Sequence, residues 1–334
     1  THRSRAQVHF NRWASLRKRS HRGLRQCAAL GLALMGSSEA VSILEAAVLT
    51  GARRQQTQVD EDSQGPLLEI QALASMQTDA ATGALARRYI ETPEDLSCAW
   101  GVGMARPTPE LVSLLADRSR GTRPETRRHA LWALALVAPP ETVLPVVRQA
   151  LRDTEEQVWS TAAWAAGRTH LTALAPELLA LIEQGKDRRG AAAWALLQLG
   201  QTPVVERLFP VFDRQLRTPH DPEGLGLGAL AVALVGLAPG RAMGRVEALS
   251  LNQAAPRFAR DCATEVLRRR PAGDRINDFW VSTCVPYDRP GLRFQPGQVV
   301  DATAFGWQGA PVGGSPPLPL VRADEVVKLS GLRG

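Results

Sequence analysis

Apolar residues recur along the middle of the chain in blocks of 30 to 32 residues. Three of these blocks are centred on Trp132, Trp164 and Trp194. In each block alanines flank the tryptophan, a break at Pro, Gly or Thr follows, and Leu or Val then recurs at positions i, i+3 and i+4. This spacing predicts two helices per block, because residues three and four apart share one helical face. A fixed period of this length indicates a stack of repeated helix pairs.

The same register continues on both sides of these blocks. Further blocks, some of them degenerate, are anchored at Trp100, Leu230, Leu73 and Cys262. Residues around Leu30 match those around Trp132 at a constant offset of 102 residues. One helix pair cannot bury its own apolar face, so neighbouring pairs are expected to stack and share a continuous core. We therefore predict an all-α solenoid of about seven helix pairs over residues 22–270.

The blocks resemble HEAT repeats, in particular the short class named for phycobilisome lyases. The residues that match the outline of this class are Asp153, Val158, Ala162, Ala163, Ala165 and Gly167, and then Asp187, Arg189, Ala192, Ala193, Ala195 and Gly200. Trp159 stands where the family expects Arg. The resemblance implies a HEAT-like α-solenoid. It does not select a function, because such repeats serve scaffolds, adaptors, lyases and DNA-binding enzymes.

The three central tryptophans have two interpretations. In a stack of repeats, Trp132, Trp164 and Trp194 would form an internal column of apolar anchors. Alternatively, the column could line a concave groove and stack on bases or on a planar ligand. Their identical register in successive repeats favours the core.

The positive charge of the chain is concentrated near its beginning. Residues 1–58 contain ten Arg or Lys and two acidic residues, whereas the remainder contains 30 basic and 31 acidic residues. We interpret residues 1–21 as a basic N-terminal arm or a capping helix over Gln7–Arg19, with an organellar targeting segment and a signal peptide as alternatives. The candidate binding residues of this arm are Arg5, Arg12, Trp13, Lys18 and Arg19. Such a face could bind RNA, DNA or another polyanion, acidic lipid headgroups or an acidic protein, or it could simply keep the end of the solenoid solvated.

The composition changes again after residue 270. Residues 271–334 contain eight Pro and nine Gly and lose the helical period. We expect an extended, largely non-helical C-terminal arm, with strand-like pieces at Phe279–Val285 and Gln298–Ala302 and polyproline II at Pro316–Leu320. Trp280 and Trp307 are its candidate anchors, on the solenoid's end or on a partner, because a large aromatic buries more apolar area than small-residue helices offer.

The sequence shows no catalytic or cofactor motif above background. Cys27, Cys98 and Cys262 fall in expected helices as small core residues, and with Cys284 they show neither metal-ligand nor disulfide-framework spacing. A G-x-G-x-x-A string begins at Gly226, but no strand is expected before it. His129 and His170 are expected on a helix surface or in a loop. The Arg-rich runs at residues 118–128 and 257–270 are expected to pair with acidic residues between stacked repeats.

These observations predict a non-catalytic protein-binding scaffold or an assembly subunit of a larger complex, with protein partners and no cofactor or metal. The alternative is a nucleic-acid-binding protein that contacts RNA or DNA phosphates through its basic arm. A lower-ranked alternative, implied by the resemblance alone, is a bilin-lyase-like enzyme, and a HEAT-like DNA glycosylase is another. No apolar run approaches the ~20 residues of a transmembrane helix, so we expect a soluble or peripheral protein, and the sequence leaves an organellar and a cytoplasmic location open.

Overall fold

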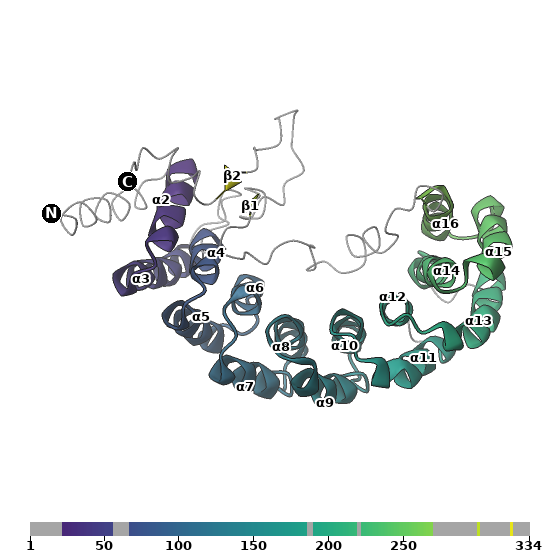
Figure 1. Ribbon diagram of the computed structural model, residues 1–334, viewed down its shortest axis with the longest axis horizontal. Helices are drawn as coiled ribbons and strands as arrows, with labels where there is room; N and C mark the ends of the chain where they lie inside the picture. Colours follow the sequence, from purple (N-terminus) through teal and green to yellow (C-terminus); the bar gives the residue numbers. More distant parts are fainter. Residues whose placement is uncertain are drawn as a thin grey trace. The chain divides into compact units, whose positions relative to one another are not determined.

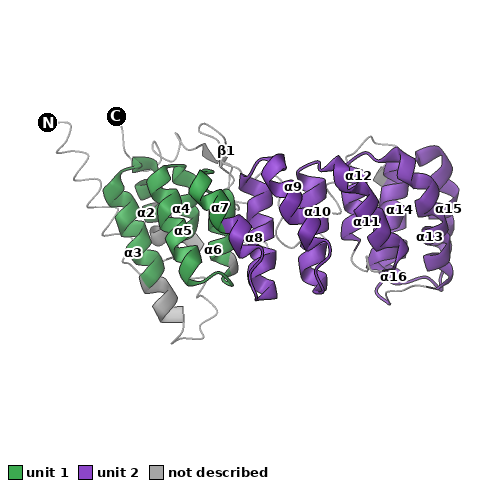
Figure 2. Cartoon of the chain, turned by 90° about the horizontal axis from the view of Figure 1, so that it is seen from below, with its two compact units in different colours: residues 1–114, 291–334 green, residues 115–290 purple. Residues whose placement is uncertain are grey.

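The computed structural model describes residues 22–55, 67–185, 190–218, 222–269, 299–300 and 321–322. This part of the chain contains fifteen α-helices, two short 3-10 helices and two strands of two residues each (Figure 1). The chain forms two compact units, one of residues 1–114 and 291–334 and the other of residues 115–290 (Figure 2). The expectation of an all-α solenoid is confirmed, and the α-helices make seven successive pairs followed by one further helix within the described residues.

Unit 1 consists of helices that alternate between two layers. Its elements are α2 (Arg22–Met35), α3 (Ser38–Gln55), α4 (Leu67–Met76), α5 (Asp79–Glu91), α6 (Leu96–Met104) and the first part of α7 (Pro109–Arg118). Helix α4 packs against α2 and α6 in one layer, and α3 packs against α5 in the other. Two short strands also belong to this unit, β1 (Val299–Val300) and β2 (Val321–Arg322), which pair antiparallel. Strand β1 lies within the strand-like piece expected at residues 298–302.

Unit 2 has the same two-layer arrangement and contains the regularly spaced Trp132, Trp164 and Trp194. Its elements are α8 (Pro124–Val137), α9 (Pro140–Ala150), α10 (Glu156–Arg168), η1 (Thr172–Leu174), α11 (Ala175–Glu183), α12 (Ala191–Gln198), η2 (Thr202–Val204), α13 (Val205–Arg217), α14 (Leu225–Leu237), α15 (Pro239–Leu251) and α16 (Arg257–Arg269). In Figure 1, α8, α10, α12, α14 and α16 form one layer of this unit and α9, α11, α13 and α15 the other. We call these the first and the second layer.

The first layer is held together by close packing of small residues. Helix α10 packs against α8 and α12, and α14 packs against α12 and α16. At Gly167 an added Cβ would lie 2.8 Å from the Cα of Ala195, so the backbones of α10 and α12 approach to a distance that leaves no room for a side chain. Alanine-rich faces permit a close approach because their side chains are small. The approach stabilises the layer, since dispersion contacts increase as the helices come closer.

Equivalent repeats of unit 2 end their first helix in the same way. His170 and Gly200, 30 residues apart, both have positive φ, 55° and 63° respectively. In both repeats the next residue donates its backbone N–H to a carbonyl five positions earlier, from Leu171 to Ala166 and from Gln201 to Leu196. This is the Schellman arrangement, which normally takes glycine at the left-handed position. His170 therefore occupies a position that the following repeat gives to glycine.

Candidate interaction surface

The three central tryptophans are core residues. Trp132 on α8, Trp164 on α10 and Trp194 on α12 expose only 2%, 1% and 4% of their surface. Trp159, which replaces the arginine expected by the resemblance, is also buried. The interpretation as internal anchors is confirmed, and these rings do not form a stacking platform for bases or a planar ligand.

The described cysteines, Cys98 and Cys262, are buried thiols with raised pKa values. Cys98 on α6 and Cys262 on α16 are free thiols that expose 1% of their surface. Burial, followed by the negative charge of Asp95, raises the pKa of Cys98 to about 12. Burial, followed by the charge of Asp261, raises the pKa of Cys262 to about 12 as well. Cys27 lies on α2, but its side chain and the whole of Cys284 are outside the described residues.

Other candidate positions are accounted for by the helical packing. Gly226 and Gly228 of the G-x-G-x-x-A string lie on α14, as the repeat register predicts. His170 lies in the exposed turn after α10, as expected. The expectation of a surface position for His129 was wrong, because this residue is 4% exposed on α8. Within the described residues no group of three or more His, Cys, Asp or Glu side chains could hold a metal ion.

Ion pairs join the helices of the second layer of unit 2. The pairs are Arg148 with Glu177, Arg207 with Glu183, Arg241 with Glu206, and Arg245 with Asp213. Each pair connects one helix of this layer to the next, from α9 through α11 and α13 to α15. The guanidinium carbons of Arg241 and Arg245 also lie 5.0 and 4.6 Å from the ring centroid of Phe209. The second layer therefore presents a surface on which basic and acidic groups alternate.

Arginines gather at one point of unit 2, around an open cleft of about 640 Å³. The cleft lies where the turn after α7, the end of α9 and the α9–α10 loop meet. The arginines that line it are Arg120, Arg127, Arg148 and Arg152, and Asp153 is its one carboxylate among the described residues. Helices α7 and α9 both end here. Basic side chains near a helix C-terminus interact favourably with the negative end of the helix dipole, which explains part of the concentration of arginines. We call this feature the arginine cleft.

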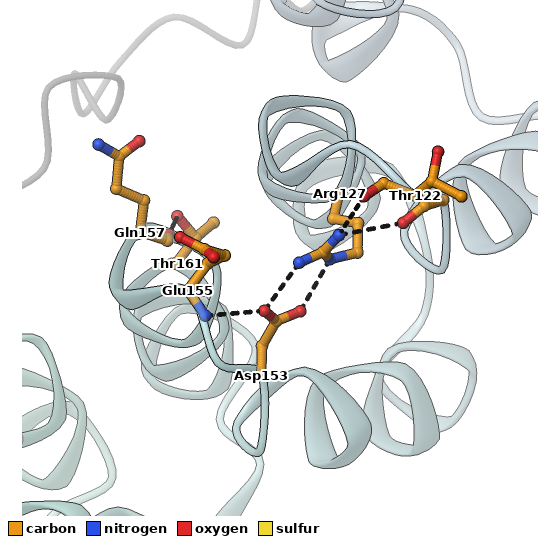
Figure 3. A network of polar contacts seen from close by, with 7 residues as sticks. Thr122, Arg127, Asp153, Glu155, Gln157 and Thr161 are labelled. Atoms are coloured by element: carbon orange, nitrogen blue, oxygen red, sulfur yellow. Dashed lines mark hydrogen bonds and ion pairs between the residues drawn. The ribbon is translucent and has the colours of Figure 1, made fainter.

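The wall of the arginine cleft is locked by a bidentate ion pair (Figure 3). Arg127 Nε and Nη2 each donate to one carboxylate oxygen of Asp153, both at 2.8 Å. The same guanidinium donates to the backbone oxygens of Gly121 and Thr122, at 3.2 and 2.9 Å. Asp153 also accepts from the backbone N–H of Glu155. One side chain thereby ties the turn before α8 to the loop before α10.

The protonation equilibrium of Asp153 reflects this arrangement. Burial by itself raises the pKa of the carboxyl, but the hydrogen bonds from Arg127 and from the backbone of Glu155 and Thr154 outweigh it, so that the net pKa lies below the ordinary value. On the other side of the pair, the hydrogen bonds to Asp153 raise the pKa of Arg127. Both side chains are charged at neutral pH and fully engaged with each other.

The other three arginines of the cleft are held loosely. Arg120 lies 3.9 Å from Asp117, a carboxylate whose side chain is 78% exposed, and donates from Nε to Gln149 at 3.3 Å. Arg148 donates from Nε to Glu177 at 3.1 Å. Arg152 is exposed, and its side chain makes neither a hydrogen bond nor an ion pair with any described residue. The cleft therefore has more positive charge than its own carboxylate neutralises.

This cleft was not predicted from the sequence. The Arg-rich runs were expected to pair with acidic residues between stacked repeats, which is confirmed for Arg127 with Asp153. The pairs of Arg257 with Asp261 and of Arg268 with Glu265 lie within α16 and do not join repeats. The candidate binding residues that it named lie outside the described residues; they are Arg5, Arg12, Trp13, Lys18, Arg19, Trp280 and Trp307. The only local signal for the cleft was that Arg148 and Arg152 are one helical turn apart at the end of an amphipathic helix.

No described helix is both long and apolar enough to cross a membrane. Residues 108–197 match a family model described as HEAT repeats. The matched segment runs from the start of α7 into α12 and includes the whole arginine cleft. A comparison with curated proteins found no match.

Proposed function

We propose that this HEAT-repeat protein is a protein-binding scaffold, or an assembly subunit of a larger complex, that acts without catalysis. HEAT repeats generally mediate contacts between proteins, and a stack of helix pairs offers a long, pre-organised surface for that purpose. The observation that carries the proposal is the arginine cleft, because it is an open feature within the HEAT-matched segment that is lined by four arginines and, among the described residues, by one carboxylate that is already paired with Arg127.

The two ends of the chain are further proposed contact surfaces. The basic arm of residues 1–21 is more one-sided in charge than an ordinary solvated face requires, and the C-terminal arm of residues 271–334 has more aromatic residues than a free linker needs. Trp280 and Trp307 are the proposed anchors of the second arm. Deletion of residues 276–334 is expected to lower either the melting temperature or the capture of the native partner. If the deletion changes neither, the arm has neither role.

The leading alternative is binding of RNA or DNA through the basic arm, and it makes a different physical prediction. Contacts to phosphates release counterions, so affinity falls steeply as salt concentration rises, whereas apolar docking depends little on salt. The test is purification of the tagged full-length chain from its native source with and without nuclease, at two salt concentrations. We expect a stoichiometric protein partner that survives nuclease and the higher salt. Recovery of nucleic acid alone, or of the chain alone, contradicts the proposal.

A further inference from the structure

We propose that the arginine cleft binds an acidic segment of a protein partner, through carboxylate side chains held by Arg120, Arg148 and Arg152. This inference rests on the proposed scaffold function and names the chemistry of the partner. Among the described residues that line the cleft, Asp153 is the one carboxylate, and both of its oxygens accept from Arg127. The other three arginines line the same open space of about 640 Å³, and their hydrogen bonds to described residues use only part of the N–H donors of each guanidinium.

The present partners of these arginines can be exchanged for those of a ligand. Asp117 lies at the limit of an ion pair with Arg120, at 3.9 Å, and both side chains are largely exposed. Arg148 and Glu177 are 42% and 30% exposed. Exposed ion pairs of this kind contribute little to stability, because water screens them and long side chains lose freedom when they pair. Arg152 has no described partner to give up. A carboxylate entering the cleft therefore displaces only weak contacts.

The cleft is also pre-organised. Its floor includes Val146 and Ala150, which are buried on α9. Its wall is fixed by the Arg127–Asp153 pair and by the bonds from Arg127 to two backbone oxygens. The loosely held guanidiniums therefore start from a backbone that the Arg127 bonds tie together, so ordering on binding falls mainly on the arginine side chains. Arginine is suited to this role because its planar fork donates two parallel hydrogen bonds to a carboxylate.

The extent of the positive surface favours an acidic peptide over a nucleic acid. Nucleic-acid backbones are bound by basic surfaces that follow several successive phosphates. Beyond the cleft, the described second layer of unit 2 alternates Arg with Glu or Asp from α11 to α15, so the positive charge does not continue. A cleft of this volume, within the roughly 300–1,000 Å³ of ligand pockets, accommodates a few side chains. We therefore commit to a short run of Asp or Glu in a partner protein.

The experiment uses the full-length chain and a fluorescein-labelled hexaglutamate peptide, with binding followed by fluorescence anisotropy. Arg152→Glu is the test variant, and Arg217→Glu is the matched control. Both arginines are exposed and lie at or just beyond the end of a second-layer helix, and the side chain of neither makes a hydrogen bond or an ion pair with described residues. We expect Arg152→Glu to weaken binding about tenfold or more and Arg217→Glu to change it less than about twofold. An unchanged affinity for Arg152→Glu, or an equal loss in both variants, overturns the proposal.

A second variant and a second readout protect the test. The double variant Arg120→Gln and Arg148→Gln is expected to weaken binding by a similar factor, even if Arg152→Glu fails to fold. The basic arm of residues 1–21 offers the peptide a competing site, so a benzophenone-bearing hexaglutamate is cross-linked to the chain and the linked residues are located by mass spectrometry. Cross-links within residues 145–154 support the proposal. Cross-links confined to residues 1–21 overturn it, as does tighter binding of a ten-nucleotide oligothymidine to the cleft.

Failure of this inference and failure of the scaffold function give different results. If the native protein partner is captured equally by the wild type and by Arg152→Glu, the cleft is not the site, while the scaffold function stands. If no protein partner is captured but hexaglutamate binding depends on Arg152, the cleft recognises carboxylates and the scaffold function is wrong.

Discussion

The clearest test of the repeat packing is the substitution Gly167→Ala. Gly167 lies near the end of α10, on the face that packs against α12. A Cβ at this position would lie 2.7 Å from Cζ3 of Trp194 and 2.8 Å from the Cα of Ala195. Neither atom can move away easily, since the first belongs to a buried ring and the second to the helix backbone. The methyl group can be accommodated only if α10 and α12 separate.

Two opposing effects determine the magnitude. Alanine is a better helix former than glycine by at most about 1 kcal/mol, which stabilises the variant. Forcing extra volume into a packed interior costs about 1–3 kcal/mol, and a clash with backbone lies at the upper end of that range. We therefore expect Gly167→Ala to lower the free energy of unfolding by about 2 kcal/mol. Because repeat stability is a sum of repeat and interface terms, the loss should fall on the α10–α12 interface and broaden the transition.

The assay is urea unfolding followed by far-ultraviolet circular dichroism and by tryptophan fluorescence. Gly244→Ala is the matched control, because Gly244 lies inside α15 and an added Cβ there meets no atom within 4 Å. Only the propensity effect operates at this position, so the control should be more stable than the wild type by about 0.5–1 kcal/mol. If Gly167→Ala is as stable as the wild type, or is stabilised like the control, the close approach of α10 and α12 is refuted.

Three further results are expected. His170→Gly should raise the free energy of unfolding by about 0.5–1 kcal/mol in urea titrations, since it relieves a left-handed backbone (φ 55°) in a residue that has a Cβ; a lower stability would contradict this reasoning. Asp153→Asn should lower stability by about 1–3 kcal/mol at neutral pH because it breaks the pair with Arg127. Because the pKa of Asp153 is lowered, the pair contributes to the free energy of unfolding above the unfolded-state pKa of about 3.9, and this contribution is lost as the pH falls through the folded-state pKa. The stabilities of the wild type and Asp153→Asn should therefore converge in acid. A constant difference in stability down to about pH 2 would exclude this linkage. Cys98 and Cys262 have pKa values of about 12, so in a variant that lacks Cys27 and Cys284 they should resist a thiol reagent at pH 8 until urea is added. Rapid labelling of the native protein would show that they are accessible.

The helical architecture could be predicted from the sequence because it depends on short-range periodicity. The recurrence of Trp132, Trp164 and Trp194 with flanking alanines indicated both the helix pairs and the buried anchors. The Gly of the repeat outline at position 167 proved to be a packing residue. A residue's face on a helix follows from its neighbours three and four positions away, so this information is local.

The arginine cleft was decided by the tertiary structure. Arg120 and Arg152 are 32 residues apart and come from consecutive repeats, and Asp153 accepts from Arg127 across 26 positions. Pairing between repeats was predicted for the Arg-rich runs, which is right for Arg127, whereas the periodicity made no prediction for Arg152. Whether a charged side chain finds a partner depends on distances of a few ångströms between loops of different repeats. Periodicity defines the face of a helix, but it does not define those distances, and only the packing of one repeat on the next brings these guanidiniums together.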